Sequence, residues 1–146
     1  MNISVNAPSY KRPDKVLTLD YLPFCRIWVD CKEYDAYKES YPSADIVSCP
    51  DGVQGNLCRV LNYILDEEFK RGMDVVLILD DDIRWIERFE VSELTGFGYE
   101  RYKLNADEVL GVAYEYTYRG QVYQVGEFSS DITTTDNSLY VKMLKS

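Results

Sequence analysis

The chain has 146 residues, with 25 acidic side chains against 16 basic ones and no histidine, so its formal net charge is −9. This length suits one compact domain, and 46% hydrophobic with 28% charged residues is a globular composition. The absence of histidine excludes Ser-His-Asp and Cys-His catalysis, imidazole-bound zinc and an imidazole general base. Acid–base or metal chemistry must therefore use carboxylates, supported by tyrosine, lysine or cysteine.

Charge, cysteine spacing and hydropathy exclude further classes of function. An acidic chain does not coat nucleic acid, because phosphate-backbone binding needs a basic surface. Contact with DNA would have to be local, through patches of Lys11, Arg12 and Lys15 or of Arg84 and Arg88. The four cysteines have no CxxC spacing, which argues against a zinc ribbon or a redox pair. No stretch approaches the ~20 apolar residues of a membrane span and no signal peptide is recognised, so a cytosolic protein without membrane contact is expected.

Short apolar runs alternate with helical patterns in the first half of the chain. Strands are predicted at residues 3–5, 24–29, 45–49 and 75–79, with a short helix at 32–40. The clearest helix begins after Asn56 and carries one apolar stripe, formed by Leu57, Val60, Leu61, Ile64, Leu65 and Phe69. This order predicts an α/β fold with a mainly parallel central sheet and helices on both faces. Ligands of such sheets gather at the carboxyl ends of the strands.

A less regular pattern, with a small β-rich portion, is predicted for the second half. An extended segment is expected at 83–91, a capped helix at 105–110 and strands at 114–118 and 122–125. The tyrosines of residues 114–118 share one strand face, where core packing is favoured over a stacking surface for a sugar or base. A last helix is predicted from Leu139, Tyr140, Met143 and Leu144.

The strongest chemical signal is Asp80-Asp81-Asp82, which follows the apolar strand at 75–79. Because strand side chains alternate, Asp80 and Asp82 are expected on one face and Asp81 on the other, with the first two about 7 Å apart. One would bind Mg²⁺ or Mn²⁺ and the other a neighbouring hydroxyl, with phosphate oxygens and water completing the metal. A solvated strand end is the competing interpretation, but three adjacent like charges repel. We therefore expect a site for a metal-bound diphosphate.

The loop Pro8–Pro13 is a candidate nucleotide-binding loop, in which Tyr10 would stack on a base and Lys11 or Arg12 would contact phosphate. Its alternative is an ordinary polar turn. Neither a P-loop motif nor GxGxxG occurs in the chain.

Two further candidates depend on their positions near helix starts. Arg59 lies close to the expected strand-end edge, where it would meet phosphate or a nucleobase, although an arginine on a polar helix face is usually solvated. Asp136 is a candidate general base, and a helix-capping aspartate is its ordinary alternative.

Several motifs occur in a characteristic order: PSYKRP after the first strand, TLDYLP, WVDCKEYDAYKESYP, the segment Gly52–Arg59, and LILDDDI. Together they resemble the GT-A-fold glycosyltransferases, and more narrowly the TET-associated glycosyltransferases of bacteriophages, which attach sugars to hydroxymethylated pyrimidines in DNA. The resemblance covers residues 3–90 and resumes at KLNADEVL and DITTTDNSLYVKMLKS. It implies a single Rossmann-like GT-A domain, with residues 1–90 as the nucleotide-sugar and metal half and 91–146 as a shortened acceptor-side half.

The resemblance also implies roles for individual residues. A UDP-linked sugar donor would be held by Pro8, Ser9, Tyr10, Arg12, Asp30, Arg59, Asp80 and Asp81. Asp82, with Asp80, would hold the Mn²⁺ or Mg²⁺, and Asp136 aligns with the carboxylate that deprotonates the acceptor hydroxyl. The implied acceptor is a hydroxymethylated pyrimidine of phage DNA, which places the protein in the host cytoplasm.

Two alternatives stay open. A phosphatase of the haloacid dehalogenase kind also uses D-x-D after an apolar strand, although normally on the first strand, whereas Ile83-Arg84-Trp85 follow an internal strand here. A non-catalytic, shortened GT-A scaffold that binds a partner would suit the short middle section and the −9 charge.

Overall fold

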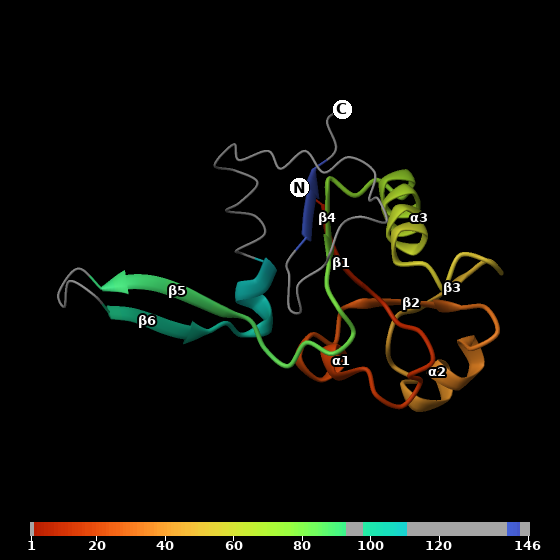
Figure 1. The fold of residues 1–146 in the computed structure, drawn as a ribbon, viewed down its shortest axis with the longest axis horizontal. Helices are drawn as coiled ribbons and strands as arrows, with labels where there is room; N and C mark the ends of the chain where they lie inside the picture. The colour runs from red at the N-terminus through yellow and green to blue at the C-terminus, as the bar shows by residue number, and fades with distance from the viewer. Residues whose placement is uncertain (1, 93–97, 111–139, 144–146) are drawn as a thin grey trace.

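A five-stranded sheet of order β3-β2-β1-β4-β7 forms the centre of the computed structural model, which describes residues 2–92, 98–110 and 140–143 (Figure 1). Strands β1 to β4 are parallel to one another. The sheet and its helices comprise β1 Ile3–Pro8, α1 Leu17–Tyr21, β2 Arg26–Asp30, α2 Tyr34–Ser40, β3 Ile46–Cys49, α3 Leu57–Lys70 and β4 Val75–Ile78. The strands β5 Glu87–Ser92, β6 Gly98–Lys103 and β7 Tyr140–Met143 follow. The predicted α/β class and its parallel sheet are confirmed, and the ends of β1 to β4 and of α2 lie within three residues of the predicted ones.

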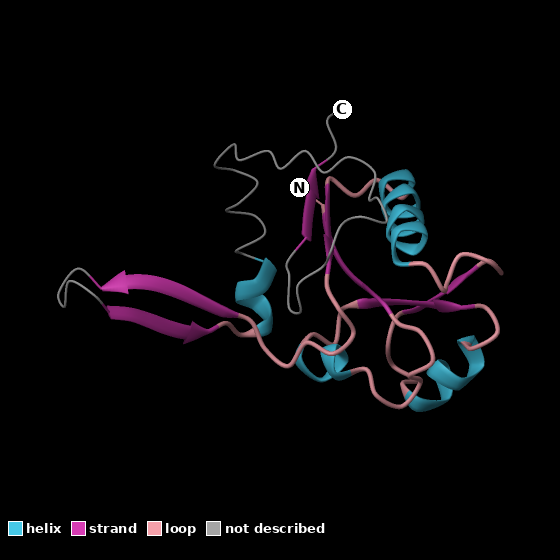
Figure 2. Ribbon diagram, viewed as in Figure 1, coloured by secondary structure: helices cyan, strands magenta, loops and turns pink. Residues whose placement is uncertain are grey.

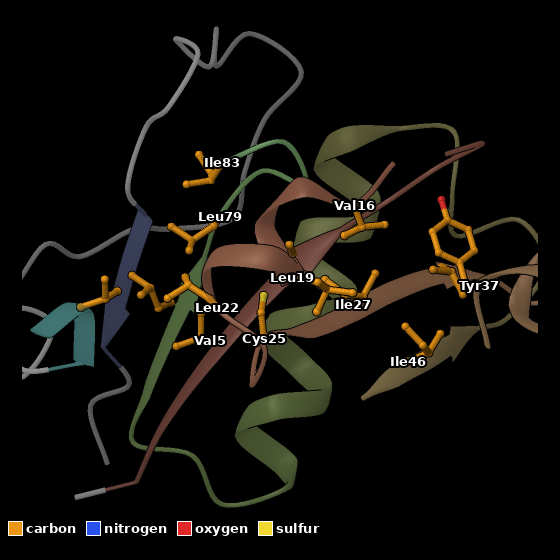
Figure 3. Packing of buried hydrophobic residues seen from close by; sticks show 14 of the residues in the cluster. Val5, Val16, Leu19, Leu22, Cys25, Ile27, Tyr37, Ile46, Leu79 and Ile83 are labelled. Carbon is orange, nitrogen blue, oxygen red and sulfur yellow. The ribbon is translucent and has the colours of Figure 1, made fainter. Parts of the chain in front are cut away.

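Helices cover both faces of the sheet, as the sequence predicts (Figure 2). Alternate strand residues serve the two faces, so Val29 packs toward α1 and α2 while Trp28 packs toward α3. Figure 3 shows the first cluster, where Tyr37 of α2 lies beside Ile27 and Ile46 with its hydroxyl directed away from the apolar side chains.

Helix α3 forms as its sequence predicts. The Asn56 side chain accepts a 3.0 Å hydrogen bond from the Arg59 backbone N–H, which satisfies one of the free amides at the helix start. The apolar stripe is buried against Val76 and Ile78 of β4 at Val60, Leu61, Ile64 and Leu65. Within the described residues no helix is long and apolar enough to cross a bilayer.

The strand order contains a topological switch beside β1. The chain runs from β1 outward to β2 and β3, then crosses by α3 to β4 on the other side of β1. The loops that leave β1 and β4 lie next to one another at the carboxyl ends of these neighbouring strands, beside the switch point, where open α/β sheets form a crevice. This geometry positions the candidate site described below.

The expected helix at the end of the chain is wrong, because residues 140–143 form β7. Tyr140 pairs with Ile78 and Met143 with Val75, antiparallel to β4. Tyrosine and valine favour strands, and the open edge of β4 offers unpaired backbone groups that a strand can satisfy. Asp136 and the strands predicted at 114–118 and 122–125 lie outside the described residues.

Beyond the sheet, β5 and β6 form an antiparallel hairpin that extends away from it (Figure 1). Strand β5 covers the second part of the strand or extended segment predicted at 83–91, whereas its partner β6 was not predicted. Its base is tied to the body where the Tyr21 hydroxyl of α1 donates to the Leu104 carbonyl and the Leu104 N–H donates to Ile86 O at 2.9 Å. The predicted capped helix begins after Asn105, whose side chain and that of Glu108 cap one another's backbone N–H groups.

A buried carboxylate joins α3 to the start of β2. The Glu68 side chain is only 1% exposed and lies 2.6 Å from Nη2 of Arg71 and 3.1 Å from Nε of Arg26. Arg26 also contacts Asp45 at 2.8 Å. This cluster fixes the packing of α3 on the sheet at the end opposite the carboxyl-end crevice.

Candidate functional site

The loop after β1 and the turn after β4 meet in the crevice beside the switch point. Ser9 Oγ donates a 2.7 Å hydrogen bond to Oδ2 of Asp81. The Arg12 guanidinium lies 3.2 Å from Oδ1 of Asp81 and 4.0 Å from Oδ2 of Asp82. Two neighbouring carboxylates thus converge on one arginine from a loop about seventy residues earlier in the chain.

The acidic triplet does not keep the alternation of a strand. Strand β4 ends at Ile78, and residues 81–82 form a turn, so the period of two stops before the carboxylates. The expectation that Asp81 would face away from Asp82 is therefore wrong, because both reach Arg12. Asp81 is buried, whereas the Asp82 side chain is 54% exposed and Asp80 is half-buried.

Thr18 of α1 holds this turn through three hydrogen bonds. Its hydroxyl donates to the Asp80 carbonyl at 2.5 Å and accepts from the Ile83 N–H at 3.0 Å. Its own N–H donates to the Asp81 carbonyl at 3.1 Å. Since Thr18 is fully buried, these bonds replace water for the backbone of the acidic turn.

Tyr37 of α2 fixes the other side of the crevice. Its hydroxyl accepts from the Arg12 N–H at 3.0 Å and lies 2.8 Å from Ser9 Oγ. Because each hydroxyl has one hydrogen and that of Ser9 goes to Asp81, the Tyr37 hydrogen goes to Ser9. A one-way chain of hydrogen bonds therefore runs from Arg12 through Tyr37 and Ser9 to Asp81, and burial raises the pKa of Tyr37.

Backbone strain accompanies this loop. Lys11 has φ +58°, the left-handed region that residues with a Cβ seldom adopt. Its N–H donates to Oε2 of Glu33 at 3.2 Å, and the next N–H, that of Arg12, reaches Tyr37. The conformation thus directs successive amides of the loop to side-chain acceptors on one neighbouring segment.

The pKa of Asp81 is raised above its ordinary value, chiefly by burial of the carboxylate. The hydrogen bond from Ser9 and the charge of Arg12 oppose this shift, and the negative charge of Asp82 adds to it. Asp81 therefore depends on its two partners to carry a charge in this crevice.

A cleft of 350 Å³ lies between the loop after β1 and the start of α3, and Asp81 also borders it. Its lining consists of Pro8, Ser9, Tyr10, Arg12, Gln54, Gly55, Asn56, Leu57, Val60 and Asp81. Tyr10 and Leu57 are large and solvent-exposed, at 40% and 45%, so the cleft has an apolar wall facing polar groups. The volume falls within the range of small-molecule sites, roughly 300–1,000 Å³.

A second cleft, of 420 Å³, adjoins the first on the far side of Arg12. It is lined by Lys11, Arg12, Asp14, Lys15, Leu17 and Asp82. Arg12 lines both clefts and thus lies between them.

The predicted site residues divide into three groups. The structure brings together Pro8, Ser9, Tyr10, Arg12 and Asp81 in the first cleft, with Asp82 beside them. Arg59 does not face the cleft, because its guanidinium donates to the carbonyls of Val53 at 3.0 Å and Gln54 at 3.2 Å. It braces the loop that forms the cleft wall, and Gln54 in turn donates to the Trp28 carbonyl at 2.9 Å.

Asp30, at the end of β2, is separate from both clefts. Its carboxylate accepts from Sγ of Cys31 at 3.4 Å, and ligand atoms of Asp30, Cys31 and Asp51 lie within 4.8 Å of one another. Lys32 already pairs with Asp51 at 3.2 Å, so this exposed group has an internal counter-ion. It offers little support for a metal site.

Thr18, Tyr37 and Gln54 were not identified from the sequence. These residues position the site, but they are uncharged, and charge was the main signal used to find binding sites. Thr18 occurs in the TLDYLP motif and Tyr37 in the tyrosine-rich helix, but neither periodicity nor spacing reveals their partners. No protein-family model matches this chain, and no curated protein matches it.

Proposed function

We propose that the protein is a metal-dependent glycosyltransferase of the GT-A kind that binds a nucleotide sugar, UDP-linked, in the first cleft. One observation carries the proposal: the loop of Ser9 and Arg12 and the turn of Asp81 and Asp82 meet at the switch point of a parallel sheet. Crevices at this position bind ligands in open α/β sheets. The resemblance in sequence supports the same function.

The residues beside the cleft fit a divalent cation. Asp82 is exposed and offers hard oxygen ligands, which Mg²⁺ and Mn²⁺ prefer, and Asp80 precedes it by two residues. Asp81 is committed to Ser9 and Arg12, so it serves the site by orienting Arg12. The guanidinium shows that a positive charge is stabilised beside these carboxylates. A bound metal would offset the negative charge that builds on a leaving diphosphate.

The remaining lining suits a nucleoside diphosphate. Tyr10 and Leu57 offer apolar surface to a base, and Arg12 offers a forked donor to phosphate. The start of α3 also borders the cleft, and the amides and dipole at a helix start favour phosphate groups.

Transfer also needs a base for the acceptor hydroxyl. We propose Asp136 for this role on the resemblance alone, since it lies outside the described residues. The resemblance also supports a hydroxymethylated pyrimidine of DNA as the acceptor. Donor binding is the part of the proposal that the described residues support, so it is tested first.

Isothermal titration calorimetry with UDP and Mn²⁺ tests donor binding. The expected result is binding that requires Mn²⁺ and weakens at least tenfold in Asp82→Ala. Asp51→Ala is the matched control, because it removes an exposed carboxylate that pairs with Lys32 away from the cleft. Binding that does not need Mn²⁺, or that is equal in the two variants, would overturn the proposal.

Turnover separates the proposal from its rivals. A glycosyltransferase should slowly hydrolyse a UDP-sugar in a Mn²⁺-dependent manner even without acceptor. Hydrolysis of a generic phosphomonoester that Asp80→Asn abolishes would favour the phosphatase. UDP binding without turnover of either substrate would favour the non-catalytic scaffold.

A further inference from the structure

Arg12 occupies the position in which a metal would neutralise the acidic turn. Its guanidinium lies 3.2 Å from Asp81 and 4.0 Å from Asp82, and it forms the boundary between the two clefts. Its backbone is held by the hydrogen bond to Tyr37, whereas its side chain is 52% exposed. The backbone of Arg12 is therefore held in place, while its exposed guanidinium has room to change its ion-pair partner.

A metal on Asp82 and the guanidinium in its present place would repel one another. Mg²⁺ and Mn²⁺ lie about 2.1 Å from a carboxylate oxygen, so a cation on Asp82 would come within a few ångströms of Arg12. Arg12 and the metal would then bring three positive charges to the two carboxylates that contact Arg12, those of Asp81 and Asp82. A diphosphate changes this balance, because it brings negative charge that attracts both the metal and Arg12.

We propose that Arg12 is an internal counter-ion that competes with the metal, and that the diphosphate of the nucleotide draws it away. In the free protein Arg12 pairs with Asp81 and Asp82, which keeps the affinity for metal alone low. When nucleotide and metal bind together, the guanidinium moves to phosphate and Asp82 becomes available. This inference rests on the proposed function, and it makes metal and nucleotide binding mutually dependent.

Electron paramagnetic resonance of Mn²⁺ measures metal binding without any activity. Arg12→Gln should bind Mn²⁺ alone about three- to tenfold more tightly than the wild type, because one repelling charge is gone. The same variant should bind UDP with Mn²⁺ more weakly, since phosphate has lost its forked donor. Opposite signs for the two affinities distinguish a competing counter-ion from an ordinary ligand-binding arginine.

Two variants serve as controls. Arg12→Lys keeps the charge and should bind Mn²⁺ alone as the wild type does. Lys15→Gln removes a unit charge from the second cleft. Among the described residues Lys15 forms no ion pair with Asp81 or Asp82, so this variant should change the Mn²⁺ affinity less than Arg12→Gln does. The increase in Arg12→Gln should shrink as salt is added.

The inference fails if Arg12→Gln binds Mn²⁺ alone no more tightly than Lys15→Gln. A wild-type measurement covers the case in which Arg12→Gln does not fold: the Arg12 side-chain NMR signal should shift when UDP and Mg²⁺ are added together and stay unchanged with Mg²⁺ alone. A signal that responds equally to Mg²⁺ alone overturns the inference. The proposed function fails on a different result: the wild-type protein would then bind no UDP, either with or without metal.

Discussion

Ser9 and Asp81 are joined by a 2.7 Å hydrogen bond although 72 positions separate them in the chain. The bond connects the loop that leaves β1 with the turn that leaves β4, and so spans the crevice at the switch point. Because the Asp81 carboxylate is buried, Ser9 and Arg12 take the place of water around it. The polar side of the cleft is therefore held together by contacts within the protein.

Replacing Tyr37 with phenylalanine should break the hydrogen-bond chain that supports this loop. The Arg12 N–H would lose its acceptor, and the buried Ser9 hydroxyl would lose its donor. The free energy of unfolding should therefore fall by about 1–3 kcal/mol. Urea denaturation measures it. Tyr34→Phe, on the same helix, is the control, since the described residues give its hydroxyl no hydrogen bond. An equal effect in both variants would contradict the assigned role of Tyr37.

Thr18→Val should loosen the acidic turn while keeping the shape of the side chain. The Asp80 carbonyl and the Ile83 N–H lose their shared partner, and the expected cost is about 1–3 kcal/mol in the free energy of unfolding. Thr18→Ser keeps the hydroxyl and should retain the wild-type affinity for UDP with Mn²⁺, whereas Thr18→Val should lose part of it. If the serine variant loses as much nucleotide affinity as the valine variant, the hydroxyl is not what positions the turn.

The raised pKa of Asp81 predicts the sign of a pH effect on stability. The native protein holds this proton more tightly than the unfolded chain, so the contribution of Asp81 to stability is greatest below its ordinary pKa of 3.8. The contribution is lost as the pH rises through the native pKa. Consequently the difference in unfolding free energy between the wild type and Asp81→Asn should decrease from about pH 3 to about pH 7. A difference that grows with pH would show a lowered pKa instead.

Glu68→Gln should affect stability but not ligand binding. The carboxylate is buried between Arg26 and Arg71, whose side chains remain 21% and 43% exposed and can partly hydrate when it is neutralised. We expect a loss of about 1–3 kcal/mol in the free energy of unfolding, with unchanged affinity for UDP and Mn²⁺. The control is Glu67→Gln, a half-buried residue whose side chain lies 3.6 Å from Lys70, and this variant should change stability by less than about 0.5 kcal/mol. Altered nucleotide binding in Glu68→Gln would mean that this end of the sheet communicates with the cleft.

Local patterns in the sequence predicted much of the parallel sheet. The continuous apolar run of β4 and the apolar stripe after the Asn56 cap predicted that strand and α3, because both patterns are dictated by burial on known faces. The predicted parallel sheet also implied that the loops of Ser9 and Asp81 would meet, because the carboxyl ends of parallel strands lie at one edge. These features need no knowledge of distant partners.

The errors occur where a distant partner decides the structure. The short pattern around Tyr140 and Met143 suits a helix or a strand equally, and pairing with β4 decides between them. The side-chain directions of the acidic triplet depend on where β4 ends, which Thr18 and the turn determine. Arg59 was predicted to meet phosphate or a nucleobase, and its guanidinium instead donates to the carbonyls of Val53 and Gln54, contacts that its place on the helix does not specify.

Helix α1 has only five residues, yet it contacts both the acidic turn and the base of the projecting hairpin, which follows that turn in the chain. Thr18 secures the acidic turn, and three positions later Tyr21 secures the base of the projecting hairpin. A single helical turn therefore contacts both features. A molecule that bound the hairpin and displaced Leu104 would act, through Tyr21 and Thr18, on the turn that carries the carboxylates.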